Sequence, residues 1–390
     1  MAEFDTQKVG YSLTIDEKYH NTLDITGFSR MMKDPSYCYK FYWLEAIVRL
    51  ISRDVHEATF DEIIDEMICN AWYSVREFHI HLSGVGIDGQ VRDGLERAIL
   101  TLSELSDLPA NASEVEIKNE IKKHNTSLKE YKNQLTNNVP YRALASFFPD
   151  QLKDPDWAVG RVTEYIRVLN DSKVLLPYIL GEESRLNKKV YFQSPWIEMI
   201  QDNTVSILGW IQYEKMKWLQ NNNPEVPGLV HKLEPMNEKE RKLNRVRKLW
   251  EGVLEIREIK DVFTGKPVEP KKYDVDHFIP WSFVMNDELW NLMPMDSSLN
   301  SVKSNRLPKW DPFFGRFADN QYVLYELISE KDGIHKLYEA CFKDNLHSIW
   351  AGQELYRKGN SKNEFYNILE KNMHPVYDSA RRQGYEVWNL

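Results

Sequence analysis

The chain has 390 residues, of which 42% are hydrophobic and 12% aromatic, and its formal net charge is −9. This composition supports a folded core and excludes disordered and collagen-like classes. No apolar run approaches the roughly 20 residues that span a bilayer, and the first residues lack the basic-then-apolar layout of a signal peptide. The three cysteines are too few and too far apart for a disulfide framework or a four-cysteine zinc site. We therefore expect a cytoplasmic protein with no membrane partner.

The first 225 residues predict a mostly helical domain. The run Lys40–Ile51 is apolar on nearly all sides, which indicates a buried helix. Two capping boxes, Thr59 with Glu62 and Ser113 with Glu116, predict helix starts. Further elements expected here are a strand at 189–192 and helices at 157–169 and 204–220. The run 222–228, rich in Asn, Pro and Gly, then predicts a domain boundary.

Basic residues concentrate just after this boundary. Residues 226–310 carry 15 Lys and Arg against 13 Asp and Glu, a net charge of +2, so the rest of the chain carries −11. Within 238–260, apolar residues recur at helical spacing, and three basic residues share another face of the same helix: Arg241, Arg245 and Lys248. Two interpretations stay open, an amphipathic helix with a solvated charged side or a basic surface that contacts nucleic-acid phosphates.

A compact strand–loop–strand–helix unit is predicted next. A strand is expected to enter a turn over 261–267, another to start at Tyr273 and end at Pro280, and a third to cover 292–295. Asp296 then caps a short helix to about Asn305, and beyond Trp310 the pattern is helical again. The predicted fold class is therefore mainly α. We expect a helical domain at 1–225, a small ββα unit with its basic helix at 226–310, and a helical C-terminal extension at 311–390.

The residues that could carry chemistry gather in the ββα unit. His277 follows Asp276 at the end of a predicted strand, and an imidazole of near-neutral pKa is a suitable base for activating water. Asn300 and Lys303 are three residues apart on the following helix, so they share one face. If that face packs on the strand, Asp276 and Asn300 offer two oxygen ligands suited to Mg²⁺, with Mn²⁺ as a substitute, and Lys303 can hold a phosphate oxygen. Adjacent strand residues point to opposite faces, so Asp276 and His277 can cooperate only at a kink or strand end.

This pattern resembles the HNH (ββα-metal) endonucleases, and especially the HNH domain of RNA-guided CRISPR effector nucleases. The matching positions are Thr264-Gly265-Lys266-Pro267, Asp276-His277, Pro280, Ser282-Phe283, Asn291, Asn300 and Lys303-Ser304. The resemblance implies that His277 is the general base and that Asp276 and Asn300 are metal ligands. It also implies that Asn291 fixes the loop and the histidine, and Lys303 matches the lysine of the family motif.

The segment differs from those HNH proteins that four zinc-binding cysteines brace, because no cysteine lies between Cys69 and Cys341. Hydrophobic packing must then brace it, by Phe278, Trp281, Phe283, Trp290 and Leu292. The flanking regions are similar to uncharacterised bacterial HNH proteins with anti-phage defence or restriction functions. The candidate nucleic-acid-binding residues are Arg241, Arg245, Lys248, Lys303 and Arg306.

Two functional hypotheses follow. The first is a metal-dependent HNH endonuclease that hydrolyses phosphodiester bonds in DNA, with RNA not excluded, within a bacterial defence or restriction system. A single site of this kind cuts one strand, so a double-strand break would need a homodimer or two successive nicks. The sequence contains no Walker A motif, so an ATPase or sensor would have to be a separate partner protein. The second hypothesis is a non-catalytic protein that binds nucleic acid or a partner through a degenerate HNH fold, because the −11 charge of the remaining chain is a poor surface for phosphate.

Overall fold

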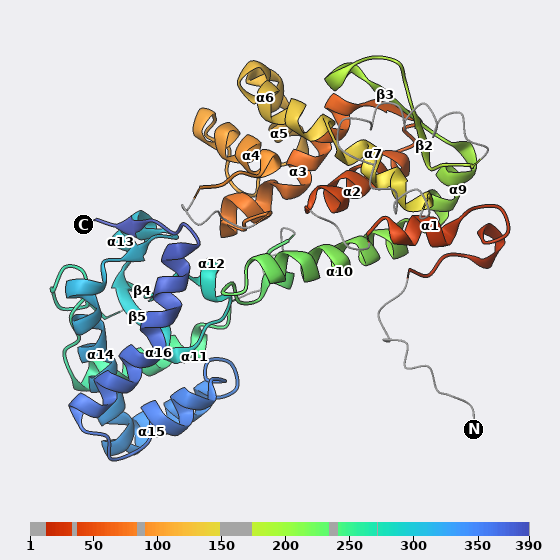
Figure 1. Ribbon diagram of the computed structural model, residues 1–390. Helices are drawn as coiled ribbons and strands as arrows, with labels where there is room; N and C mark the ends of the chain where they lie inside the picture. The colour runs from red at the N-terminus through yellow and green to blue at the C-terminus, as the bar shows by residue number, and fades with distance from the viewer. Residues whose placement is uncertain are drawn as a thin grey trace, which may run out of the picture. The chain divides into compact units, whose positions relative to one another are not determined.

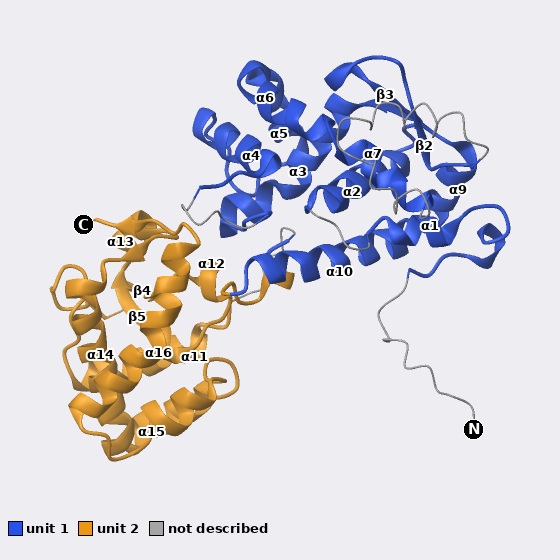
Figure 2. Cartoon of the chain, viewed as in Figure 1, with its two compact units in different colours: residues 1–224, 232–235 blue, residues 225–231, 236–390 orange. Residues whose placement is uncertain are grey.

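The computed structural model describes residues 13–32, 37–83, 90–148, 174–233, 241–270 and 272–389. The chain divides into two compact units, residues 1–224 with 232–235 and residues 225–231 with 236–390 (Figure 2). Both units are mainly helical, as predicted, and their sheets are small (Figure 1). The helix predicted at 157–169 lies outside the described residues. Within the described residues, no helix has the length and apolar character needed to cross a membrane.

Unit 1 is built from helices around a small sheet. Both capping boxes are confirmed, since the Thr59 and Ser113 side chains accept hydrogen bonds from the backbone N–H groups of Glu62 and Glu116. The predicted buried helix is α2, and the predicted long helix at 204–220 is α10. The described helices of unit 1 are α1 (Ile25–Arg30), α2 (Tyr39–Ser52), α3 (Phe60–Phe78), α4 (Gly94–Leu105), α5 (Glu114–Lys123), α6 (Asn125–Thr136), α7 (Val139–Leu144), α9 (Ser194–Asp202) and α10 (Thr204–Asn222).

The sheet of unit 1 has three antiparallel strands in the order β1-β3-β2. The central strand is β3 (Lys189–Phe192), which matches the predicted strand, and it is flanked by β1 (Glu57–Thr59) and β2 (Tyr178–Leu180). Val190 of β3 is paired with both Ala58 and Leu180 and is fully buried. The sheet therefore joins residues near 58 to residues near 180, a pairing that local sequence patterns do not reveal.

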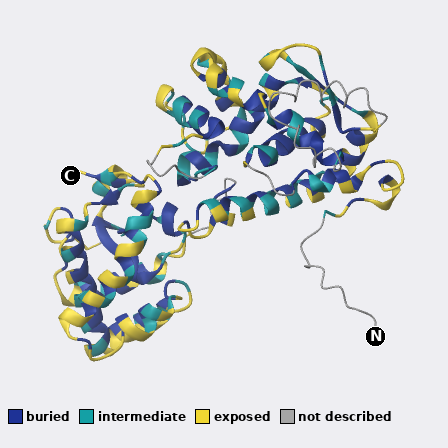
Figure 3. Ribbon diagram, in the orientation of Figure 1, coloured by how far each residue is buried: buried dark blue, intermediate teal, exposed yellow. Residues whose placement is uncertain are grey.

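Unit 2 contains the predicted ββα segment and the C-terminal helices around one hydrophobic core. That core runs from Val246 to Trp388, so residues 311–390 share it with the ββα segment, and Figure 3 shows the buried residues along the inward faces of these elements. Its elements are α11 (Asn244–Ile256), β4 (Tyr273–His277), α12 (Trp281–Val284), β5 (Leu292–Asp296), α13 (Ser297–Lys303), β6 (Leu307–Pro308), α14 (Trp310–Glu330), α15 (Asp332–Cys341), α16 (Lys362–Arg382) and β7 (Val387–Trp388). Strands β4 and β5 form an antiparallel hairpin, and β6 pairs with β7 in parallel.

Of the strand expected to enter a turn over 261–267, the turn is confirmed but the strand is wrong, because a tight turn occupies this segment. Asp261 is buried, and its carboxylate accepts hydrogen bonds from the backbone N–H groups of Phe263, Thr264 and Asp296. Only Lys260 and Pro267 pair, as an isolated antiparallel bridge, and Gly265 takes the left-handed conformation that the turn requires. A side chain that satisfies several backbone donors favours a turn over a strand, and here it also ties the turn to the end of β5.

Aromatic packing braces the hairpin, in agreement with the absence of zinc-binding cysteines. Phe278 is fully buried, and its ring lies 4.8 Å from that of Phe317 and 6.0 Å from that of Trp310. Phe283 packs edge-on against Tyr385, and Trp290 lies 5.3 Å from Trp350. Because each of these contacts joins the ββα segment to the C-terminal helical region, those helices do the bracing that a metal does elsewhere.

Candidate active site

The two faces of β4 carry different residues. Tyr273, Val275 and His277 are buried on one side, whereas Asp274 and Asp276 are partly exposed on the other. The hairpin register places His277 opposite Leu292 and Asp276 opposite Met293, and α13 contacts both strands. This is the period-two alternation of a strand, so adjacent Asp276 and His277 face opposite sides. Even so, each charge is near enough to shift the pKa of the other.

Lys303 joins α13 to the end of β4. Its side chain is 1% exposed, and its ammonium group donates to Oδ2 of Asp276 at 2.8 Å and to the backbone carbonyl of His277 at 2.8 Å. Burial alone would raise the pKa of Asp276, but the Lys303 charge, with help from His277, holds that pKa below its ordinary value. The Asp276 carboxylate is therefore ionised and fixed in position. Lys303 braces the site from within, so its predicted place on a nucleic-acid-binding surface does not agree with its burial.

Asn300 reaches the other carboxylate on the same face of β4. Its side-chain nitrogen lies 3.4 Å from Oδ2 of Asp274, and the guanidinium of Arg247 lies 3.8 Å from Oδ1 of that residue. Asn300 and Lys303 thus share one helix face, as their spacing predicts. Asn300 contacts Asp274, and Lys303 contacts Asp276. The structure brings Asn300 to Asp274, whereas the sequence predicted a pair with Asp276. The face as a whole gathers two carboxylates and one amide.

His277 has a fully enclosed imidazole with three polar partners. An Nη of Arg241 lies 2.9 Å from its Nδ1, while its Nε2 lies 3.0 Å from the carbonyl oxygen of Asn286 and 3.2 Å from a carboxylate oxygen of Asp287. A guanidinium can only donate, so Nδ1 accepts and the ring proton resides on Nε2, which donates to the loop. The partners fix both the orientation and the tautomer of the imidazole.

The surroundings of His277 also set its charge. Burial lowers its pKa, and the nearby Arg241 charge adds to that effect, while the contact with Asp287 opposes it. Burial alone would raise the pKa of Asp287, but the hydrogen bond and charge of His277, with Arg241, hold it below the ordinary value. His277 is therefore neutral at neutral pH, and Asp287 is ionised. A neutral imidazole whose Nδ1 carries the lone pair is the form that can accept a proton.

Asn291 locks the loop that follows β4. It is fully buried, its side-chain oxygen accepts from the N–H of Ile279 at 2.8 Å, and its side-chain nitrogen donates to the carbonyl of Ile279 at 2.8 Å. Its backbone carbonyl accepts from the N–H of Phe278 at 2.9 Å. The residue before β5 thereby holds the two residues after His277, and its role in fixing the histidine stays a prediction.

We expect the substitution Asn291→Ala to lower the free energy of unfolding by about 2–4 kcal/mol, because it leaves the buried N–H and C=O of Ile279 without partners. Urea unfolding followed by tryptophan fluorescence measures this. Asn300→Ala is the matched control, since Asn300 is partly exposed and loses one long contact, and it should change stability by less than about 1 kcal/mol. Equal effects of the two substitutions would contradict the proposed lock.

The predicted nucleic-acid-binding residues do not form one free basic surface. Arg245 is in an ion pair with Asp344, and Arg306 donates to the backbone carbonyls of Val302 and Lys303, at the end of α13. Lys248 is exposed on α11. Of this group, Lys248 is open to solvent, Arg241 is engaged with His277, and the other three are held by contacts within the unit.

Sequence reasoning missed three residues of this site: Asp274, Asn286 and Asp287. The alternation of β4 could have found Asp274, because residues two apart on a strand share a face with one another. Asn286 and Asp287 belong to the polar loop between the strands, where nothing local shows that the chain turns back to His277. The left-handed conformation of Met285, which ends α12, makes that turn.

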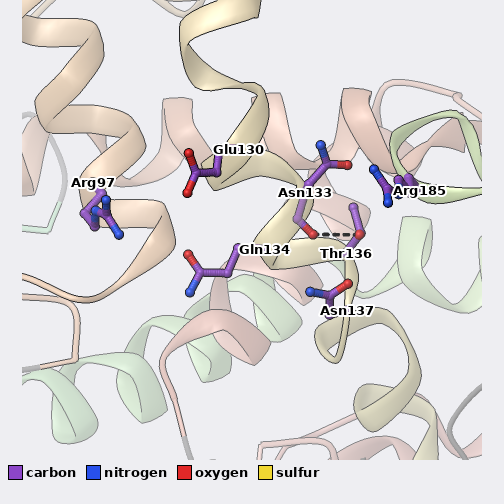
Figure 4. Close-up of a pocket in the computed structure, with 7 residues that line it drawn as sticks. All are labelled: Arg97, Glu130, Asn133, Gln134, Thr136, Asn137 and Arg185. Atoms are coloured by element: carbon purple, nitrogen blue, oxygen red, sulfur yellow. Dashed lines mark hydrogen bonds between the residues drawn. The ribbon is translucent and has the colours of Figure 1, made fainter. Parts of the chain in front are cut away.

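A separate depression of about 390 Å³ lies in unit 1 (Figure 4). Arg97 and Arg185 lie at its opposite sides, with Glu130 and Gln134 between them. The residues that line it are Arg97, Glu130, Asn133, Gln134, Thr136, Asn137 and Arg185. None of them is a predicted site residue, so this depression is no part of the site on β4 and α13.

Comparison with protein families agrees with this geometry. Residues 261–309 match the family described as HNH endonuclease, which spans the Asp261 turn, both strands of the hairpin and α13. This part of the chain is therefore an HNH endonuclease domain, a kind of domain that is typical of nucleases. Searches of curated proteins and of solved structures gave no match.

Proposed function

We propose that this protein is a divalent-metal-dependent endonuclease that hydrolyses phosphodiester bonds in DNA. The observation that carries the proposal is the neutral His277 imidazole, with its proton-bearing Nε2 held by Asn286 and Asp287, at the end of a strand whose other face carries Asp274 and Asp276. The HNH family match over the same residues supports a nucleic-acid substrate. A binding protein would have no need for a base with a fixed tautomer on a strand that also carries two carboxylates.

The residues on the face of β4 suit a hard cation. Asp274, Asp276 and Asn300 offer carboxylate and amide oxygens, which Mg²⁺ and Mn²⁺ prefer. Among the described residues no three His, Cys, Asp or Glu side chains form a metal-binding group, so most of the coordination shell would be left to water and phosphate. Asp276, Asn300 and also Asp274 would hold the ion. When bound, it would neutralise charge on the phosphate.

Residues of this chain can take up the proton that the attacking water loses. Water attacks the phosphorus while its proton passes to Nδ1 of His277, and the bond from phosphorus to the leaving oxygen breaks. The leaving oxygen departs with the bonding electron pair and takes a proton from solvent. Asp287 and the Asn286 carbonyl retain the proton on Nε2 and stabilise the imidazolium that forms. Lys303 keeps Asp276 ionised and anchors the His277 backbone, so the base stays in place.

The test is cleavage of supercoiled plasmid by the full chain with Mg²⁺ or Mn²⁺. We expect nicked product with either ion, none with EDTA, and a rate at least about 10-fold lower for Asn300→Ala, because one oxygen donor is lost. A single-stranded DNA and an RNA in parallel reactions define the substrate. Cleavage that persists in EDTA, or that Asn300→Ala leaves unchanged, would contradict the proposed metal-dependent site.

A further inference from the structure

Arg241 occupies the one nitrogen of His277 that can act as a base. Its Nη donates to Nδ1 at 2.9 Å, while the other ring nitrogen is committed to Asn286 and Asp287. A water molecule cannot give its proton to Nδ1 while a guanidinium N–H points at the same lone pair. In this arrangement the imidazole has the correct tautomer for catalysis but is blocked.

The contacts of Arg241 are ones that a phosphate can replace. Its side chain is 37% exposed, its two nitrogens lie 3.3 Å from the same oxygen of Asp287, and it lies over the ring of Trp281 at 5.6 Å. The bond to His277 is made to a neutral acceptor. Phosphate oxygens carry charge and match the guanidinium fork with two parallel hydrogen bonds, so they bind it more strongly than an imidazole does.

We propose that Arg241 is a latch that blocks His277 in the free protein and is released when a nucleic-acid phosphate takes its guanidinium. This inference rests on the proposed function, because it assigns His277 the role of base. The latch ties exposure of the base to the presence of a phosphate chain. It thereby favours polymeric substrates, which bring further phosphates, over small phosphodiesters and restrains hydrolysis when no nucleic acid is bound.

The first experiment measures access to His277 without metal or substrate. Diethyl pyrocarbonate acylates neutral imidazole nitrogens, and peptide mass spectrometry quantifies the product at each histidine. We expect His277 to be protected in the wild type and modified about 10-fold faster in Arg241→Gln. Arg257→Gln is the matched control, since Arg257 follows α11 and pairs with Glu326 instead, and it should leave His277 protected.

Internal references are available in the same digests. His56 and His335 have side chains that are 63% and 53% exposed, so their modification reports the reagent dose. Thermal unfolding of each variant shows whether the fold is retained. If His277 in folded Arg241→Gln reacts no faster than in the wild type, the latch is overturned.

The second experiment compares two substrates with Mg²⁺ or Mn²⁺ present. Arg241→Gln should hydrolyse bis(p-nitrophenyl) phosphate about 10-fold faster than the wild type, because Arg241 no longer blocks Nδ1 of His277 and the small ester does not have to displace it. The same variant should bind plasmid more weakly, since one phosphate contact is lost. A slower reaction with the small ester would overturn the latch and leave Arg241 as a phosphate-binding residue. A different result would be that the wild type cleaves neither substrate while His277 is protected from diethyl pyrocarbonate as expected. That result would overturn the nuclease proposal but not the contact between Arg241 and His277.

Discussion

Replacing His277 with alanine should lower the rate of plasmid cleavage by about 10²- to 10⁴-fold, which is the usual contribution of a general base. His277 alone in this site combines a fixed tautomer, a lone pair on Nδ1 and a lowered pKa. Without it, water must lose its proton to solvent. His277→Asn should have the same effect, because an amide cannot accept that proton at neutral pH.

Chemical rescue separates this role from a structural one. The alanine variant leaves a cavity with Asn286 and Asp287 at its wall, so added imidazole should restore part of the activity. His335→Ala, an exposed position on α15, is the control and should cleave at the wild-type rate. Wild-type cleavage by folded His277→Ala would remove His277 from the mechanism. If His277→Ala loses both its activity and its fold, the activity of folded His277→Asn decides whether His277 is the base.

Replacing Lys303 with methionine should lower the free energy of unfolding by about 3–5 kcal/mol, the cost of leaving one partner of a buried ion pair alone. The Lys303 side chain is 1% exposed and that of Asp276 is 15% exposed, so water compensates for little of the lost contact. The His277 carbonyl also loses its donor. Urea unfolding of the full chain measures the shift.

The control for this effect is Lys309→Met. Lys309 is exposed just before α14, so we expect a change of about 0.5 kcal/mol or less. A double substitution, Lys303→Met with Asp276→Leu, should recover part of the stability because no charge then stays buried. If the free energy of unfolding of Lys303→Met lies within about 1 kcal/mol of the wild-type value, Lys303 does not stabilise the site as described above.

Much of the local structure was predictable because local forces decide it. The capping boxes at Thr59 and Ser113 work within a single turn, so their helices start where predicted. The strand from Tyr273 also begins where predicted. The strand expected at the start of 261–267 did not form. Its apolar residues suit a strand, but the Asp261 side chain accepts the backbone N–H groups of a turn and reaches Asp296, a contact that spans 35 residues.

In the site, too, local spacing was predictable and the contacts between elements were not. The spacing of Asn300 and Lys303 places both on one helix face, and this was predictable from helix geometry. Which carboxylate each one meets depends on where α13 lies along β4, which the hairpin register and the surrounding core determine. For that reason Asn300 contacts Asp274, and Lys303 takes Asp276.

Residue type and short-range spacing were enough to predict the mainly helical class, the order of the ββα elements and most of the residues that could do chemistry. The contact of Arg241 with His277, the orientation of the imidazole by Asp287 and the burial of Lys303 come instead from tertiary packing. Such contacts join residues 10 to 36 positions apart through the packing of α11, the loop after α12 and α13, and free energies of packing depend on the whole unit rather than on any short segment.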